Sequence, residues 1–95
     1  MDLPEAFAHD IEKAISILKA EGSSEIYLFG SLCTDEWTEN SDIDLATRGI
    51  KAESFFSVYS RIGRELEHDL DLIDLDHELE FAQFLMSTNR LVKIA

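Results

Sequence analysis

Residues 28–47 read LFGSLCTDEWTENSDIDLAT, and this stretch decides the fold. Its beginning belongs to the run EIYLF, residues 25–29, which is apolar, rich in strand-forming residues and followed by Gly30. Such a run predicts a buried strand that ends in a turn. Residues 32–41 show no hydrophobic period and are expected to form a loop. A second short strand, IDLAT, then starts near Ile43.

Two aspartates stand at the start of this second strand. Asp42 and Asp44 are two residues apart, so their side chains project from one face while Ile43 and Leu45 anchor the other. Neighbouring carboxylates repel each other, and a divalent cation relieves that repulsion. Mg²⁺ takes one or two protein carboxylates and completes its shell with water and substrate phosphates. The spacing therefore predicts a metal and nucleotide site, although acidic pairs also occur on solvated strand faces.

The turn after the first strand suits a phosphate group. Gly30 lets the backbone approach a ligand or adopt a positive φ, because it has no side chain to clash. Backbone N–H groups and the Ser31 hydroxyl would then hold the phosphate at the start of the following turn or helix. A Gly-Ser pair alone is only a turn in most sequences. Its significance comes from the aspartate pair that follows at a fixed distance.

The remaining elements follow from hydrophobic spacing. A helix is predicted over residues 4–20, with Asp2 as its cap and Gly22 beyond its end. The later elements are a helix over about 52–67, a strand of alternating Leu and Asp over 68–76, a helix over 78–87, and a last strand or docked tail over 91–94. This order predicts an α/β or α+β domain with a small mixed sheet and packed helices, while the strand order stays open.

Size and charge restrict the function. We expect 95 residues to form one domain, 1–95, with no room for a separate substrate domain. The net charge of -12 repels free nucleic acid and favours metal cations or a basic protein partner. A single cysteine, Cys33, fits a reducing cytoplasm, and no run approaches the length of a membrane span, so we expect a cytoplasmic protein. A homo-oligomer remains open.

The pattern Gly30-Ser31, ten residues, then Asp42-x-Asp44, with SDIDL at residues 41–45, resembles the minimal nucleotidyltransferases of the polymerase-β superfamily. The resemblance extends over nearly the whole chain and implies the polymerase-β nucleotidyltransferase fold. It also implies a third carboxylate on a neighbouring strand, and LDLIDLD at residues 70–76 resembles that strand. Asp71 stands at the matching position, with Asp69 and Asp74 as alternatives.

The resemblance implies an activity and a partner. Asp42, Asp44 and Asp71 would bind Mg²⁺ or Mn²⁺, and a nucleoside monophosphate, AMP from ATP, would pass to an acceptor hydroxyl. Stand-alone members of the family are often paired with a helical protein of the HEPN class, which would carry the acceptor. No side-chain nucleophile is needed, so the three histidines are expected at the surface and not in catalysis: His9, His68 and His77.

One departure from the family favours a second interpretation. Members often carry arginine at the first and third positions after Gly-Ser, where this chain has Leu32 and Thr34 followed by Asp35. The missing cations would weaken triphosphate binding. The alternative function is therefore a weak or inactive, antitoxin-like module that masks a basic partner. Trp37 in the same loop is expected to pack on the core, or else to face a base or a partner.

Overall fold

A computed structural model describes residues 4–88 and 91–95 of the chain. The elements are α1 (Glu5–Ala20), β1 (Glu25–Phe29), the short 3-10 helix η1 (Gly30–Cys33), β2 (Ile43–Arg48), α2 (Ala52–Glu65), β3 (Leu70–Asp74), α3 (Leu79–Ser87) and β4 (Val92–Lys93). The predicted order of elements is therefore confirmed. The predicted cap Asp2 lies outside the described residues.

Several elements are shorter than predicted, among them β4, which spans Val92–Lys93 where the sequence predicted a strand or tail over 91–94. The second helix ends at Glu65 and not near residue 67, and β3 spans Leu70–Asp74 where the sequence predicted 68–76. At one end, Asp10 accepts hydrogen bonds from the backbone N–H groups of Glu67 and His68, which holds these residues in a turn. At the other end, Asp74 accepts the N–H of Asp76 and stops the strand.

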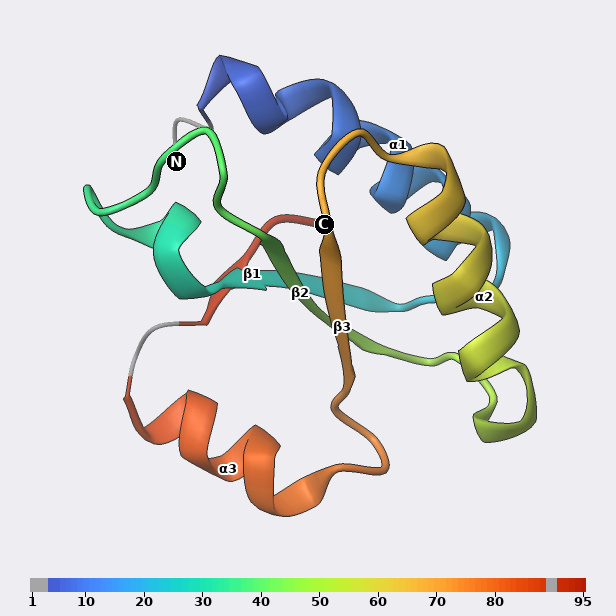
Figure 1. The fold of residues 1–95 in the computed structure, drawn as a ribbon. Helices are drawn as coiled ribbons and strands as arrows, with labels where there is room; N and C mark the ends of the chain where they lie inside the picture. The colour runs from blue at the N-terminus through green and yellow to red at the C-terminus, as the bar shows by residue number, and fades with distance from the viewer. Residues whose placement is uncertain (1–3, 89–90) are drawn as a thin grey trace.

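The four strands form one mixed sheet in the order β3-β2-β1-β4 (Figure 1). β1 is antiparallel to both β2 and β4, and β2 is parallel to β3. This confirms the predicted small mixed sheet. β2 is central, and the register places its Asp44 between Phe29 of β1 and Asp71 of β3.

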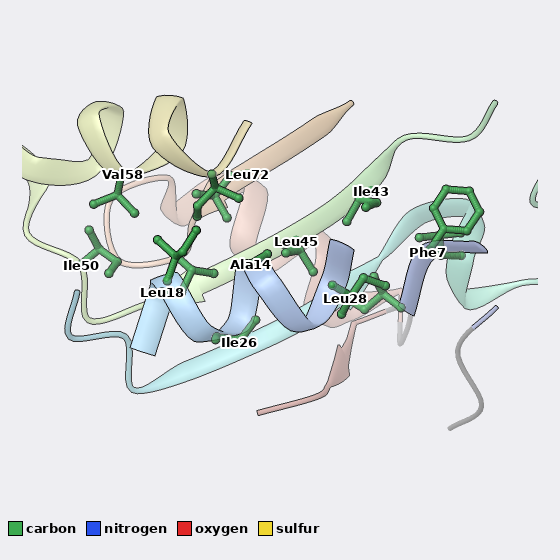
Figure 2. Close-up of a cluster of buried hydrophobic side chains, with 14 of the residues drawn as sticks. Phe7, Ala14, Leu18, Ile26, Leu28, Ile43, Leu45, Ile50, Val58 and Leu72 are labelled. Carbon is green, nitrogen blue, oxygen red and sulfur yellow. The ribbon is translucent and has the colours of Figure 1, made fainter. Parts of the chain in front are cut away.

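Helices α1 and α2 cover one face of the sheet (Figure 1). The predicted stripe of α1 is buried there: Phe7, Ile11, Ala14 and Leu18 have no solvent exposure. They pack on side chains of β1 and β2 that are equally buried, among them Leu28, Ile43 and Leu45, as Figure 2 shows. Each such Leu or Ile contributes about 1.5–3 kcal/mol by leaving water, so this face holds most of the core.

Helix α3 lies on the opposite face and covers less of it (Figure 1). Its buried residues, Ala82 and Leu85, pack with Phe29, Ala46 and Leu75 in a second, smaller cluster. The sheet is thus covered unequally, with two helices on one side and one short helix on the other. Asp44 and Asp71 alternate with Leu45 and Leu72 of the main core, so they belong to the α3 side.

Asp10 joins α1 to the turn before β3. Its side chain is buried, and its Oδ2 accepts hydrogen bonds from the backbone N–H of Glu67 at 3.0 Å and of His68 at 2.9 Å. The same oxygen lies 2.8 Å from Nδ1 of His68. Burial alone would raise the pKa of Asp10, but these hydrogen bonds and the charge of His68 outweigh it and lower the pKa below 3.8. The ionised carboxylate therefore stabilises the fold.

We expect Asp10→Ala to lower the free energy of unfolding by about 3 kcal/mol, because it leaves two backbone N–H groups and an imidazole without their partner. The pKa of Asp10 is lower in the folded protein than in the unfolded chain. Its contribution to the free energy of unfolding is therefore complete above pH 3.8 and is lost as the pH falls through the folded-state pKa. Urea unfolding at pH 7 and pH 3 measures both effects. Glu12→Ala, on the exposed side of α1, should change little; an equal loss in both variants would contradict this role.

Candidate functional site

Three carboxylates gather where β2 and β3 begin. Asp44 and Asp71 are direct neighbours in the parallel register of these strands. Asp42 lies two residues before Asp44, just ahead of β2. Asp44 is partly buried, whereas Asp42 and Asp71 are exposed. The structure thus brings the three predicted carboxylates to one end of the sheet.

The electrostatics of Asp44 show how close these groups are. Burial, then the charge of Asp71, then the charge of Asp42 raise the pKa of Asp44 from 3.8 to about 6. Desolvation and like charges both disfavour the ionised form. A cation shared by these carboxylates would remove the repulsion, and a strongly shifted carboxyl is a common mark of a functional site.

The backbone of Gly30 lies close to the carboxylate of Asp44. Its φ is +75°, and a Cβ at this position would meet Oδ2 of Asp44 at 2.0 Å. A side chain here would be strained by the positive φ and would displace the Asp44 carboxylate, so the end of β1 lies directly against that carboxylate. The next residue, Ser31, is partly exposed, and its carbonyl accepts the N–H and the hydroxyl of Thr34, which closes η1. The predicted phosphate turn and the predicted aspartate strand are therefore in contact.

The alternatives to Asp71 occupy different positions. Asp74 is buried and accepts the N–H of Asp76, and its Oδ2 lies 2.6 Å from Nδ1 of His77. It pairs in register with Thr47, so it belongs to the face of the sheet opposite Asp44. Asp69 precedes β3 and lines a small polar hollow of about 190 Å³ together with Asp42. Asp71 remains the choice for the third carboxylate because it is the direct neighbour of Asp44 in the register of β2 and β3, and its role as a ligand remains a prediction.

The donors suit a cation that takes few protein ligands. Within residues 4–88 and 91–95, no three or more His, Cys, Asp or Glu side chains are arranged so that they close around a metal ion. Mg²⁺ needs only one or two carboxylates and completes its octahedron with water and phosphate oxygens, and Mn²⁺ accepts the same donors. Asp42, Asp44 and Asp71 provide oxygen only. One or two of them would hold such an ion in an open site that leaves positions for a substrate.

The loop between Ser31 and Asp42 lacks positive charge. It contains no lysine or arginine, and Asp35 and Glu36 are exposed. Leu32, at the first of the positions where the family often has arginine, is buried in the main core. At this position the chain therefore has a leucine that packs in the core in place of an arginine that would carry positive charge.

Cys33 and Trp37 have structural contacts. The thiol of Cys33 donates to the carbonyl of Leu28, and burial followed by the charge of Asp44 raises its pKa, so it is no activated nucleophile. Trp37 packs edge-on against Phe7 with ring centroids 5.9 Å apart, although 37% of it is exposed. Trp37 therefore packs on the core through Phe7, as predicted, while part of its side chain stays in solvent.

The histidines differ in position. His9 is exposed. His77 is also exposed, and its ring pairs with Asp74. His68 is partly buried, because it pairs with Asp10 and its ring lies tilted against that of Phe7, with centroids 4.1 Å apart. Sequence reasoning overlooked Asp10. Its position on the apolar face of a predicted helix, between Phe7 and Ile11, was the available signal.

Comparison with known families identifies the arrangement. Residues 12–94 match the family model of polymerase beta nucleotidyltransferases. The chain belongs to this family. Among solved structures, a chain of a toxin–antitoxin complex with AMP-PNP matches with a TM-score of 0.69 and 25% identity, over 86% of this chain and 69% of that chain. The comparison with curated proteins found no match.

Two further structural matches are toxin–antitoxin complexes. A chain of the MntA–HepT complex matches with a TM-score of 0.65 and 23% identity, over 90% of this chain and 68% of that chain. A chain of the complex between a tri-AMPylated HEPN toxin of Shewanella oneidensis and an MNT antitoxin matches with a TM-score of 0.65 and 22% identity, over 90% of this chain and 68% of that chain. These two matches support the nucleotidyltransferase fold. In the described part of the chain, no helix is long and apolar enough to cross a membrane.

The pKa of Asp44 predicts a pH-dependent stability in protein freed of metal by EDTA. The pKa of Asp44 is higher in the folded protein than in the unfolded chain, so ionising it lowers the free energy of unfolding. This loss develops as the pH rises from 3.8 to about 6 and is complete above that value. Asp44→Asn should therefore raise the free energy of unfolding at pH 7.5. The shift is equivalent to about 3 kcal/mol, and screening at this partly exposed group reduces the expected gain to about 1 kcal/mol.

Urea unfolding of both proteins at pH 4 and pH 7.5 measures this gain as a difference. The advantage of Asp44→Asn should shrink at pH 4, where the wild-type carboxyl is protonated. Asp35→Asn, which removes an exposed carboxylate from the loop, is the matched control and should show no gain. A variant Asp44→Asn that is less stable than wild type at pH 7.5 would show that the three carboxylates are not crowded.

Proposed function

We propose that this chain is a metal-dependent nucleotidyltransferase that moves a nucleoside monophosphate, AMP from ATP, to a hydroxyl group on a partner protein. The observation that carries the proposal is the contact between Gly30 and the Asp44 carboxylate, beside Asp71 in register. A turn able to approach a phosphate thus lies against a group of carboxylates able to hold the phosphate's cations. The family model that matches residues 12–94 supports the reaction class.

The residues have distinct roles in this proposal. Asp42 and Asp44 hold the cation that accompanies the triphosphate, and Asp71 helps hold a second one. Gly30 and Ser31 bind phosphate oxygens from the end of β1. When bound, Mg²⁺ or Mn²⁺ supplies charge neutralisation at the phosphates and lowers the pKa of the acceptor hydroxyl. The protein's own contribution is to hold acceptor and α-phosphate in line.

The reaction needs no covalent enzyme intermediate. The acceptor oxygen attacks the α-phosphorus and forms a new phosphoester bond, while the bond from the α-phosphorus to the bridging oxygen breaks. Pyrophosphate leaves with that electron pair, and the hydroxyl proton passes to a nearby carboxylate or to water. Cys33 and the histidines take no part.

A protein acceptor agrees with charge and with the structural matches. A surface with a net charge of -12 attracts basic surfaces over long distances. Chains that share this fold occur in toxin–antitoxin complexes, one containing AMP-PNP and one a tri-AMPylated HEPN toxin. We therefore propose a helical protein of the HEPN class as the partner, with modification of a hydroxyl on it as the outcome.

A second candidate function rests on the loop. The absence of any lysine or arginine from Gly30 to Asp44, together with the exposed Asp35 and Glu36, removes positive charge where a triphosphate would lie. A chain that binds the partner without modifying it would act as an antitoxin by masking a basic surface. The two functions differ in whether label from ATP reaches the partner.

The test is transfer of label from α-³²P-ATP to the purified HEPN-class partner in the presence of Mg²⁺. We expect a labelled partner, and we expect Asp42→Asn with Asp44→Asn to reduce the initial rate by about 100-fold or more, since both remove ligands of the proposed cation. Mass spectrometry locates the modified hydroxyl. The control Glu5→Gln with Glu12→Gln removes two charges from α1 and should leave the rate unchanged.

Each other outcome has a definite meaning. Label that persists at the wild-type rate in the double aspartate variant would refute these residues as the transfer site. A stable complex without label would leave the masking function.

A further inference from the structure

Helix α3 exposes most of its apolar residues. Six of the nine residues in its sequence LEFAQFLMS are apolar, yet only Ala82 and Leu85 are buried. The other four remain in solvent, with exposed fractions of 61% for Leu79, 39% for Phe81, 61% for Phe84 and 45% for Met86. Apolar helix surface is normally covered, and a large exposed apolar patch marks an interaction site.

Part of this surface is hollowed and has an acidic rim. His77, Glu78, Leu79, Glu80, Phe81 and Phe84 line one open depression, which we call the α3 groove. Its apolar lining comes from Leu79, Phe81 and Phe84. Glu78 and Glu80 are exposed beside them, and this lining holds no lysine or arginine. The groove thus combines apolar side chains with negative charge.

The α3 groove lies on the same side of the sheet as the candidate site. The ring of Phe81 contacts that of Phe29 edge-on, with centroids 6.3 Å apart. Phe29 directly precedes Gly30 and pairs with Asp44. A molecule bound in the groove would therefore lie on the same side of the sheet as Asp44 and Asp71, whereas one bound over α1 would be separated from them by the sheet (Figure 1).

We propose that the α3 groove is the docking surface for the acceptor protein, and that it takes an apolar segment of that protein flanked by lysine or arginine. This inference rests on the proposed function, whose acceptor is a partner protein. The apolar residues of the segment cover Leu79, Phe81 and Phe84, and its cations pair with Glu78 and Glu80. A second copy of this chain fits less well, because a symmetric contact brings these acidic rims together in a protein of net charge -12.

The first experiment measures the affinity of the full chain for the HEPN-class partner by isothermal titration calorimetry. Exposed anchors at interfaces often carry most of the binding energy, so we expect Leu79→Gln with Phe84→Gln to weaken the affinity by about 30-fold or more. Both side chains are largely exposed, so the variant should fold. Ala6→Gln with Ala20→Gln is the matched control, because both residues are exposed on α1, on the other face of the sheet, and do not line the α3 groove; its affinity should remain at the wild-type value.

Charge reversal tests the acidic rim separately. Glu78→Lys with Glu80→Lys should weaken partner binding by about 10-fold or more, since like charges across an interface are unfavourable. Glu5→Lys with Glu12→Lys makes the same change of net charge on α1, at the opposite side of the sheet, and should weaken binding much less. Equal losses in both variants would show that only the overall charge matters and would overturn the docking site.

Kinetics separate docking from chemistry. In the label-transfer assay, Leu79→Gln with Phe84→Gln should raise KM for the partner and leave kcat unchanged, because the variant loses binding energy equally in the ground state and in the transition state. Its affinity for ATP should stay within about twofold of wild type. Partner affinity equal to wild type in this variant would overturn the α3 groove as the docking surface and leave the proposed function intact.

Two further outcomes identify other occupants. Loss of ATP affinity with unchanged partner affinity would assign the groove to the nucleotide and overturn the proposal. A wild-type dimer in light scattering that becomes monomeric with Leu79→Gln and Phe84→Gln would assign it to a second copy. Absence of any complex between the wild-type chain and the partner would overturn the docking proposal and the partner together, and ATP binding would then decide whether the transferase itself remains.

Discussion

The contact between the Asp44 carboxylate and the backbone of Gly30 is the constraint on which the site depends. A side chain at position 30 would overlap Oδ2 of Asp44 and would be strained at the positive φ, so the end of β1 favours glycine. The antiparallel register of β1 and β2 fixes this contact, and the parallel register of β2 and β3 adds Asp71. The central strand therefore determines which groups meet, and the hydrophobic core under α1 and α2 holds that strand in place.

This arrangement carries an electrostatic cost. Burial and two neighbouring carboxylates raise the pKa of Asp44 to about 6, so without a cation the site destabilises the fold at neutral pH. Proteins retain such strain where function requires it. The buried carboxylate of Asp10 shows the opposite case, because backbone N–H groups and His68 satisfy it and its pKa falls. The two aspartates differ in their partners, and this difference distinguishes a structural carboxylate from a candidate ligand.

Local sequence patterns predicted most of the elements, because each has its own signature. The run at residues 25–29 and the amphipathic spacing of α1 and α2 produced the observed strand and helices with small errors at their ends. The position of Asp71 beside Asp44 could not be derived from pattern alone, since alternation also allowed Asp69; it required the register of two strands distant in sequence. The same limit applies to β4 beside β1, to the bonds of Asp10 across the fold, and to the apolar residues that α3 leaves exposed.

The central claim is that Asp42, Asp44 and Asp71 hold cations for a nucleoside triphosphate. The most direct measurement is the thermal shift of the purified chain on adding ATP with Mg²⁺, compared with ATP in EDTA. Ligands that bind only the folded state stabilise it by RT ln(1 + [L]/Kd), about 2.7 kcal/mol at one hundred times Kd. We predict a Mg²⁺-dependent rise for wild type and for Glu5→Gln with Glu12→Gln, and none for Asp42→Asn with Asp44→Asn. A wild-type chain whose melting temperature is the same with and without Mg²⁺, at millimolar ATP, would contradict the account.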